Sequence, residues 1–350
     1  MPTGSHDPDV LLDWIIESMG LVRRRSGYAD KSFDSSALHR IMRTLLADPL
    51  RGWDSKSIGD ETGLSNTGVH HHTIKLRESG LISTKVEGKW HRHILRGGSI
   101  SSATSLVSTQ ARAILGIRLE ELSDLISRSE TRMEIQSEDE EIPFSIRISE
   151  PGPRDGDRKA IDHLVDDLGL NGEKISGSDG LASILLSNLA SSDFPLTLMS
   201  LSERLSESRG RVQTVIGRMR SAGLVERVPM VDRIPQDVFT GVMRQLDARG
   251  EEWLMSRGGL GRLEANISTP LVAGAREGKL DIERVRETLS PVSLIDQQIL
   301  LNTLGGRMPY GFRMAGADGA TISRRVMRKA EQTLRRIRTV SNRLDETLAE

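Results

Sequence analysis

Two segments of the chain carry polar and basic side chains at helical spacing beside an apolar stripe. In residues 64–82 they are Asn66, Thr67, His70, His71 and Lys75, and in residues 206–225 they are Arg209, Arg211, Gln213, Thr214 and Arg218. Arginine can donate two hydrogen bonds to guanine, and asparagine or glutamine can pair in the same way with adenine. The chemistry that both segments predict is recognition of bases and phosphates in double-stranded DNA.

The histidines raise the question of a metal site, because they gather at positions 70–72 and at 91 and 93. Consecutive helical residues point about 100° apart, so the three adjacent histidines cannot all bind one ion. His91 and His93 share a strand face, but they have no acidic or cysteine partner at ligand spacing. We therefore expect no metal ion, and we expect Trp90 to pack at the base of a hairpin.

Motifs of the common catalytic sites do not occur in the sequence. It contains no GxxxxGK[ST] phosphate loop, no strand-linked GxGxxG, no HExxH and no GxSxG. It has no cysteine, which excludes disulfides, cysteine zinc sites and thiol nucleophiles. We expect a protein that is not an enzyme and that needs no cofactor.

The elements that position the first polar segment follow the order helix, helix, turn, helix and two strands over residues 34–98. A helix around Leu38–Leu46 ends at Asp48-Pro49, because proline disfavours helical geometry in the residue before it. Asp54 can cap a short second helix, and the third helix ends near Gly80. Residues 81–95 alternate about Glu87-Gly88, which predicts a hairpin that carries Lys89 and Arg92. This order is typical of a winged helix-turn-helix, in which the third helix enters the major groove.

The second polar segment sits in a similar order of helices. Helices are expected near 180–191, near 198–206 and from Ser208 to Ala222, followed by Gly223-Leu224-Val225. The hairpin that should follow is poorly marked, because residues 226–235 hold two prolines. The expected buried stripes are Leu64, Val69, Leu76 and Leu81 in the first unit, and Val212, Ile216, Met219 and Leu224 in the second.

The first segment resembles the recognition helix and following strand of arsenical-resistance-repressor (ArsR-like) regulators, through Val69, His72, Leu76, Gly80 and Leu81. Thr73 departs from the leucine that is usual in that family. The second segment resembles multiple-antibiotic-resistance-repressor (MarR-like) regulators, through Val212, Met219, Gly223 and Leu224. These resemblances imply tandem winged helices and DNA binding, and together they cover less than half of the chain.

A third, fainter resemblance is to the helix-turn-helix in the fourth region of sigma factors. It joins residues 289–306 to the basic helix beginning near residue 321, in which Arg324, Arg325 and Arg328 would contact DNA. The segment between them departs from that pattern. An alternative interpretation is a basic solvated helix with an apolar seam, which could pair with a second chain. The amphipathic first helix, residues 8–22, could also make a homodimer.

The expected fold is mainly α with small β wings (α+β), with tandem winged helix-turn-helix domains and a helical C-terminal region. The expected divisions are an N-terminal helix (1–33), the first winged helix-turn-helix (34–98), a helix with an acidic hairpin and a linker (99–157), the second winged helix-turn-helix (158–257) and the helical C-terminal region (258–350).

Charge and hydropathy limit the surroundings in which the chain works. The net charge of −1 excludes a uniformly basic coat, and positive charge concentrates instead in residues 66–96, 204–233 and 324–338. The first residues are not a basic region followed by an apolar run, and no stretch of about 18 apolar residues occurs. We expect a cytoplasmic protein with no membrane segment.

Three functions are compatible with these observations. The first is a DNA-binding transcriptional regulator that contacts the duplex through both recognition helices, as a dimer. The second is an adaptor that docks transcription or replication proteins through a winged helix, which the poorly marked second wing favours. The third is a ligand- or metal-responsive repressor with residues 99–157 as its effector domain.

Overall fold

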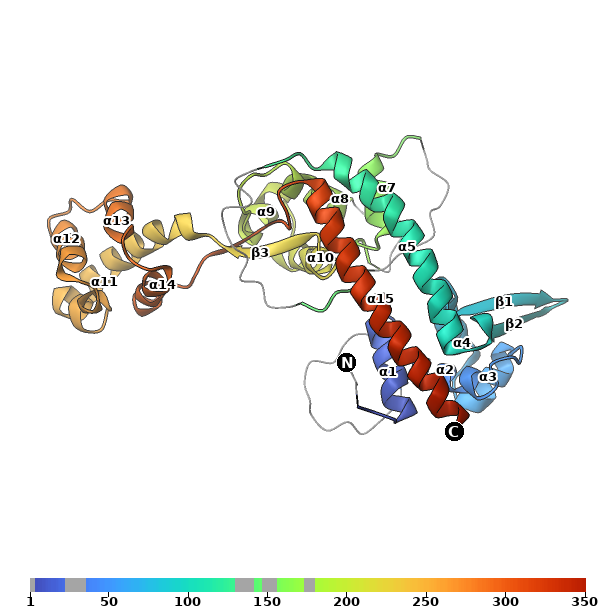
Figure 1. The fold of residues 1–350 in the computed structure, drawn as a ribbon. Coiled ribbons are helices and arrows are strands. Elements are labelled where there is room, and N and C mark those ends of the chain that lie inside the picture. Colours follow the sequence, from blue (N-terminus) through green and yellow to red (C-terminus); the bar gives the residue numbers. More distant parts are fainter. Residues whose placement is uncertain (1–3, 23–35, 130–141, 147–155, 173–179) are drawn as a thin grey trace.

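The computed structural model describes residues 4–22, 36–129, 142–146, 156–172 and 180–350 of the 350-residue chain. Two units of three helices and a small sheet lie along a pair of long helices, and a separate group of helices stands at the far end of the molecule (Figure 1). The predicted fold class is confirmed, because the described chain is mainly helical and contains two small two-stranded antiparallel sheets.

Unit 1 spans residues 36–98 and has the predicted order. It contains α2 (Ala37–Ala47), α3 (Ser55–Thr62), α4 (Asn66–Glu78), β1 (Ile82–Glu87), β2 (Trp90–Leu95) and η1 (Arg96–Gly98). The two strands pair from Ile82 opposite Leu95 to Glu87 opposite Trp90. Trp53, which precedes α3, forms an isolated antiparallel bridge with His93. Backbone hydrogen bonds of this bridge therefore connect the wing to the segment that leads into α3.

Local signals account for the boundaries of these helices. The Asp54 carboxylate accepts a hydrogen bond from the backbone N–H of Ser57 at 2.9 Å, which caps α3 as predicted. Ser65 caps α4 in the same way. Gly80 has a φ of 78°, a left-handed conformation that favours glycine, and the chain turns there from α4 into β1.

Unit 2 consists of residues 180–229 together with residues 310–314. Its helices are α8 (Leu181–Ala190), α9 (Leu198–Leu205) and α10 (Arg209–Ser221), and its strands are β3 (Val225–Pro229) and β4 (Tyr310–Met314). The strands pair from Val225 opposite Met314 to Pro229 opposite Tyr310. Leu196, just before α9, bridges to Phe312, as Trp53 bridges to His93 in unit 1. The second wing exists, but its return strand comes from far along the chain.

The segment between β3 and β4 is an inserted helical module, residues 230–309. It contains η2 (Val231–Arg233), α11 (Ile234–Ser256), η3 (Leu260–Arg262), α12 (Ala265–Arg276), α13 (Ile282–Leu289) and α14 (Leu294–Thr303). These helices share a core of their own, which includes Val238, Leu271, Val285 and Leu301. Figure 1 shows the module standing apart at the end of the second wing.

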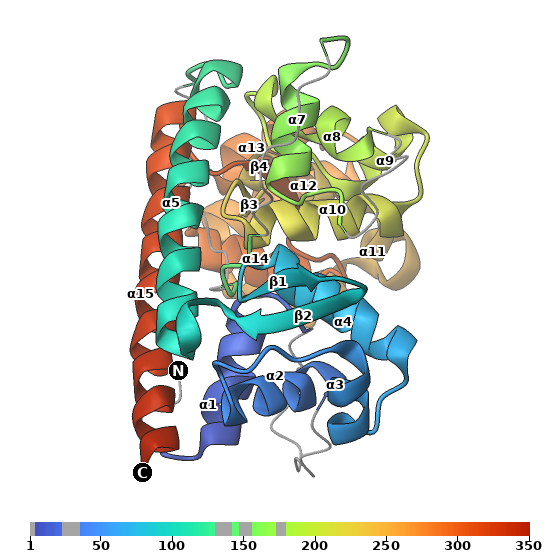
Figure 2. The same cartoon turned by 90° about the vertical axis from the view of Figure 1, so that its right-hand side faces the viewer.

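The long helices α5 (Ile100–Leu125) and α15 (Gly319–Ala349) run antiparallel, side by side, in both Figure 1 and Figure 2. Halfway along them, Arg112 donates to both carboxylate oxygens of Glu331, at 2.7 and 3.2 Å. At one end, the Asp345 carboxylate accepts from the backbone N–H groups of Ile100 and Ser101. The pair therefore links the two units.

Two further cores lie along this helical pair. The core of unit 1 includes Ile337, Val340 and Leu344 of α15 and the buried face of α1 (Pro8–Ser18). The core of unit 2 includes Ile322, Val326 and Ala330 of α15 and residues of α7 (Ala160–Asp167). One helix thus contributes to both cores, and the apolar stripes of α1 and α15 are largely covered within the chain.

Several expectations differ from these observations. The sigma-like third helix-turn-helix is wrong, because α14 and α15 are separated by β4 and pack in different cores. The boundary expected at 257/258 falls within the inserted module. The acidic hairpin lies largely outside the described residues, and residues 142–146, which are described, do not form a strand.

Candidate nucleic-acid interface

The exposed face of α4 carries four of the residues predicted to contact DNA. Asn66, Thr67, His70 and His71 are exposed. The opposite face buries Val69, Thr73 and Leu76 in the core of unit 1. Thr73, the departure from the family pattern, donates its hydroxyl to the carbonyl oxygen of His70 at 3.0 Å. The N-terminal turns of α4 therefore present polar groups to solvent, while the opposite face of the helix packs in the core of unit 1.

Lys75 differs from the other four predicted residues of α4. Its side chain is only half-exposed and makes a polar or electrostatic contact within the chain. It also lines a cavity beside the C-terminal end of α4. Since base edges are read by the N-terminal part of a recognition helix, Lys75 lies away from the part of α4 that would read them.

The wing of unit 1 projects beyond the core (Figure 1). Lys85 and Lys89 are exposed, as are Val86 and Trp90. Trp90 does not pack at the base of the hairpin as we expected: its strand position is opposite Glu87 at the turn, and 59% of its surface is exposed. Arg92 pairs with Glu87 at 2.7 Å and donates to the carbonyl of Gly52 at 3.2 Å, so it holds the wing to the segment before α3.

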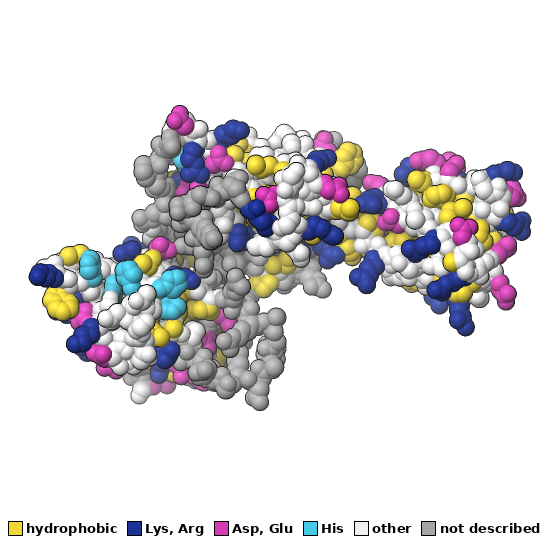
Figure 3. Space-filling model, turned by 180° about the vertical axis from the view of Figure 1, so that it is seen from behind, with side chains coloured by type: hydrophobic (Ala, Val, Ile, Leu, Met, Phe, Trp, Pro, Cys, Tyr) yellow, Lys and Arg dark blue, Asp and Glu magenta, His cyan; other side chains and the backbone are white. Residues whose placement is uncertain are grey.

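The histidines of unit 1 fall into two classes. Figure 3 shows histidine side chains gathered on one face of the unit, and His70, His71 and His91 are exposed. His93 is buried and hydrogen-bonded to the Thr84 hydroxyl at 3.0 Å, and its burial, with the nearby positive groups, lowers its pKa. Among the residues that the structure describes, no three His, Asp or Glu side chains are placed to hold a metal ion.

The exposed face of α10 carries Arg209, Gln213 and Thr214. Ser208 caps the helix by accepting a hydrogen bond from the backbone N–H of Arg211. The Arg211 guanidinium pairs with Glu207 at 2.7 Å and remains half-exposed, so phosphate contact would have to compete with that carboxylate. The buried stripe Val212, Ile216, Met219 and Leu224 is confirmed.

Arg218 connects α10 to the segment that follows α7. Its guanidinium donates to the carbonyl oxygen of Leu170 at 3.2 Å and lies against Gly172, where a Cβ atom would stand only 2.7 Å from the guanidinium. Gly172 has a φ of 86°. Arg218 therefore fixes the segment after α7 to α10 and does not belong to the exposed face.

Of the three arginines predicted to contact DNA at the start of α15, two are exposed and one is held in contacts within the chain. Arg324 and Arg328 are exposed. Arg325 donates to Glu226 at 2.8 Å and to the carbonyl of Ala315 at 3.0 Å. The same Glu226 accepts from buried Arg313 at 2.9 Å. Arg325 thus belongs to an ion cluster that joins β3, β4 and α15.

Two groups in this region were not predicted from the sequence. The first is Lys85 and Val86, which are exposed at the first wing; the alternation predicted the hairpin but did not indicate that both of its faces are exposed at the wing tip. The second is the cavity at the end of α4, whose walls come from segments far apart in the sequence.

Comparisons with known proteins add no family to this geometry. No protein-family model matches the chain, and no curated protein matches it. No helix among the described residues is both long and apolar enough to cross a membrane.

Proposed function

We propose that the protein is a DNA-binding transcriptional regulator that contacts the major groove through α4 and α10. The observation that carries this proposal is the pairing of two winged-helix units, each of which buries one face of its third helix and exposes polar side chains at that helix's capped N-terminus. Those side chains are Asn66, Thr67, His70 and His71 in unit 1, and Arg209, Gln213 and Thr214 in unit 2. The free backbone N–H groups of a helix N-terminus also suit phosphate oxygens.

Each unit would use its groups differently. Unit 1 offers a two-stranded wing with Lys85 and Lys89, which suits contact with the backbone beside the groove. In unit 2 the inserted module takes the place of a wing tip, so contact with DNA would rest on α10 alone. Because α5 and α15 join the units within one chain, a single chain carries two recognition helices. The homodimer expected from the sequence remains a proposal, for which the exposed Leu348 of α15 is the remaining support.

Titration of the full chain with a labelled random-sequence duplex at several salt concentrations tests this function. Binding should weaken steeply as salt rises, because phosphate contacts release counterions. The variant Lys89→Ala should weaken binding to all sequences and reduce the salt slope by about 1. Absence of binding at low salt, or binding that does not respond to salt, would contradict the proposal.

An adaptor function is the second candidate, and a specific observation favours it. Unit 2 exposes Ile184, Phe194 and Met199, three large apolar side chains on or between α8 and α9. Exposed apolar groups of this kind occur where proteins dock. A chain that fails to bind DNA at low salt, and that loses capture of transcription proteins after Phe194→Ser, would favour this second function.

A further inference from the structure

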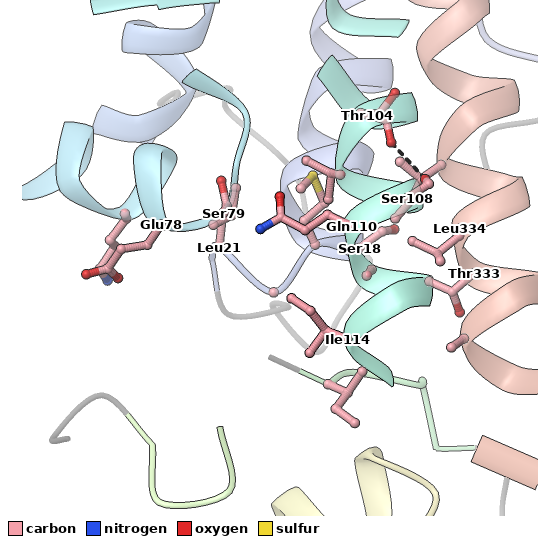
Figure 4. A pocket seen from close by; sticks show the side chains of 18 of the residues that line it. Ser18, Leu21, Glu78, Ser79, Thr104, Ser108, Gln110, Ile114, Thr333 and Leu334 are labelled. Carbon is pink, nitrogen blue, oxygen red and sulfur yellow. Dashed lines mark hydrogen bonds between the residues drawn. The ribbon is translucent and has the colours of Figure 1, made fainter. Parts of the chain in front are cut away.

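A cavity of about 830 Å³ lies where unit 1 meets the helical pair. One wall comes from the last turn of α4 and from β1, and the other from α5, α15 and Phe144; the end of α1 also contributes (Figure 4). This volume is in the range of small-molecule sites, which are commonly about 300–1,000 Å³.

The lining of the cavity is mostly apolar, with cations on one side. Leu21, Val107, Ile114, Phe144 and Leu334 are among the apolar side chains. The charged residues that line it are Lys75, Arg77 and Arg96, against Glu78 alone. All four come from α4 or from the residue after β2, so positive charge is confined to the wall on the side of unit 1.

One polar group in this lining lacks a partner. The Ser18 hydroxyl at the end of α1 is more than nine-tenths buried and has no hydrogen-bond partner among the described residues. A buried hydroxyl without a partner is costly. Its oxygen is itself enclosed, however, so a molecule in the cavity would not contact it without a shift of the end of α1. Ser18 and Gln110 both line the cavity, as Figure 4 shows.

We infer that this cavity binds an amphipathic organic anion, with its apolar body against α5 and α15 and its anionic group toward Arg96 and Arg77. Arg96 is already positioned there, because its guanidinium donates to Gln110 Oε1 at 3.2 Å. The apolar walls supply the binding energy, and the cations select the charge of the ligand.

The same cavity would couple the ligand to α4. Its wall includes Glu78 and Ser79 at the end of α4, and Gly80, the turn after α4, stands against Val107 of α5, which also lines the cavity. A ligand that prefers one position of α4 must change the affinity for anything bound by the exposed face of that helix. This coupling to DNA rests on the proposed function, whereas ligand binding does not.

Binding is tested without DNA, using 8-anilinonaphthalene-1-sulfonate fluorescence on the full chain. The variant Ala111→Phe with Thr333→Phe fills the cavity from both long helices and should weaken binding of the probe about tenfold or more, or ~1.4 kcal/mol. The matched control, Ala113→Phe with Thr339→Phe, changes the same residue types at exposed positions of the same helices and should bind as the wild type does. Thr333 and Thr339 even make the same hydrogen bond, each to the carbonyl four residues earlier.

Charge selection is tested by competition. Decanoate should displace the probe at lower concentration than 1-decanol, and the difference should shrink in Arg96→Gln. Equal binding of the probe to the filled variant and its control, or no saturable binding to the wild type, would overturn the site. If circular dichroism shows that the double variant does not fold, the competition by decanoate and 1-decanol in the wild type and in Arg96→Gln still tests the site.

Coupling is tested last, by repeating the DNA titration with decanoate present. A change in DNA affinity, matched by the same factor in decanoate affinity when DNA is added, supports it; decanoate affinity is read from displacement of the probe. If the probe binds but decanoate does not change the affinity for DNA, the proposed coupling is overturned, and the proposed ligand site still stands. Probe binding in a chain that binds no DNA at any salt concentration contradicts the proposed function alone.

Discussion

Individual arginines of α10 have different roles, although all of them are basic residues on one helix. Arg209 is exposed, Arg211 is paired with Glu207, and Arg218 donates to Leu170. Replacing all three by alanine would therefore mix an effect on DNA with an effect on stability. The structure allows these two effects to be separated.

We expect Arg209→Ala with Gln213→Ala to weaken binding of a selected DNA site while the thermal unfolding midpoint stays at the wild-type value. Both side chains are exposed and would read bases. Arg218→Ala should instead lower the free energy of unfolding by about 1 kcal/mol, because it removes a hydrogen bond to a partly buried carbonyl. Denaturant unfolding and anisotropy titration of both variants check this. Loss of stability in the first variant would mean that its side chains are structural.

His39 of α2 is buried between two carboxylates of α1. Its Nε2 is 3.0 Å from Asp9 Oδ1 and its Nδ1 is 2.5 Å from Asp13 Oδ1, and Asp9 also pairs with Arg43 at 3.2 Å. Burial lowers the pKa of His39, but hydrogen bonds and charge from Asp13 and Asp9 outweigh it, so the net pKa is raised. The imidazolium thus holds α1 to α2.

A raised pKa in the folded state means that this stabilisation is complete below the ordinary histidine pKa of about 6.5 and is lost as pH rises through the raised value. The midpoint of thermal unfolding of the wild type should therefore fall as pH rises from about 6.5 through the raised pKa of His39. His39→Asn should remove this part of the pH dependence, and His91→Gln, at an exposed position, should keep it. A wild-type midpoint that rises over this range would contradict the assignment.

At the scale of elements, the signals that act over a few residues predicted unit 1 well. Asp54, Ser65 and Gly80 set helix ends through contacts within their own turns, and the turn at Gly88 sets the register of β1 and β2. Unit 2 lacked such a signal for its wing. The partner of β3 begins at Tyr310, and nothing in residues 226–235 indicates a strand so distant.

The candidate site was predictable to a similar degree. Helical periodicity correctly separated Val212 and Met219 from Gln213 and Thr214. It could not show that Arg218 meets Leu170, because that contact depends on how α7 and the residues after it pack on unit 2. The cavity was also beyond its reach, since its walls meet only after unit 1 packs on α5 and α15.

The ion cluster around Glu226 joins three elements of the fold. Glu226 of β3 and Arg313 of β4 are both buried, and Arg325 of α15 completes the cluster. Glu226→Ala should cost about 3–5 kcal/mol, because removing one partner leaves a buried charge without compensation. Denaturant unfolding measures this cost. Glu207→Ala, which breaks a partly exposed pair with Arg211, should cost less than about 1 kcal/mol. Equal costs would contradict the structural role of the cluster.

At the scale of the whole molecule, α5 and α15 make the two units interdependent. One end of α15 completes the core of unit 1 and the other end completes the core of unit 2. Truncation after residue 335 would remove Ile337, Val340 and Leu344 from unit 1. We expect the truncated chain to lose protection of unit 1 amides from hydrogen exchange, while α8 and α10 stay protected. Uniform loss across both units would mean that they unfold as a single cooperative body.

The ends of the inserted module meet, because the backbone N–H of Met230 donates to the carbonyl of Pro309 at 2.8 Å. From the point of view of chain connectivity, the second wing is a hairpin whose turn has been replaced by a folded body. Forming its ladder closes a long loop, but each doubling of loop length costs only about 0.6 kcal/mol, and a module that folds first shortens the effective loop to the gap between its own ends. The wing of unit 2 should thus assemble after the module in refolding, whereas the two strands of unit 1 are joined by a short turn and close no long loop.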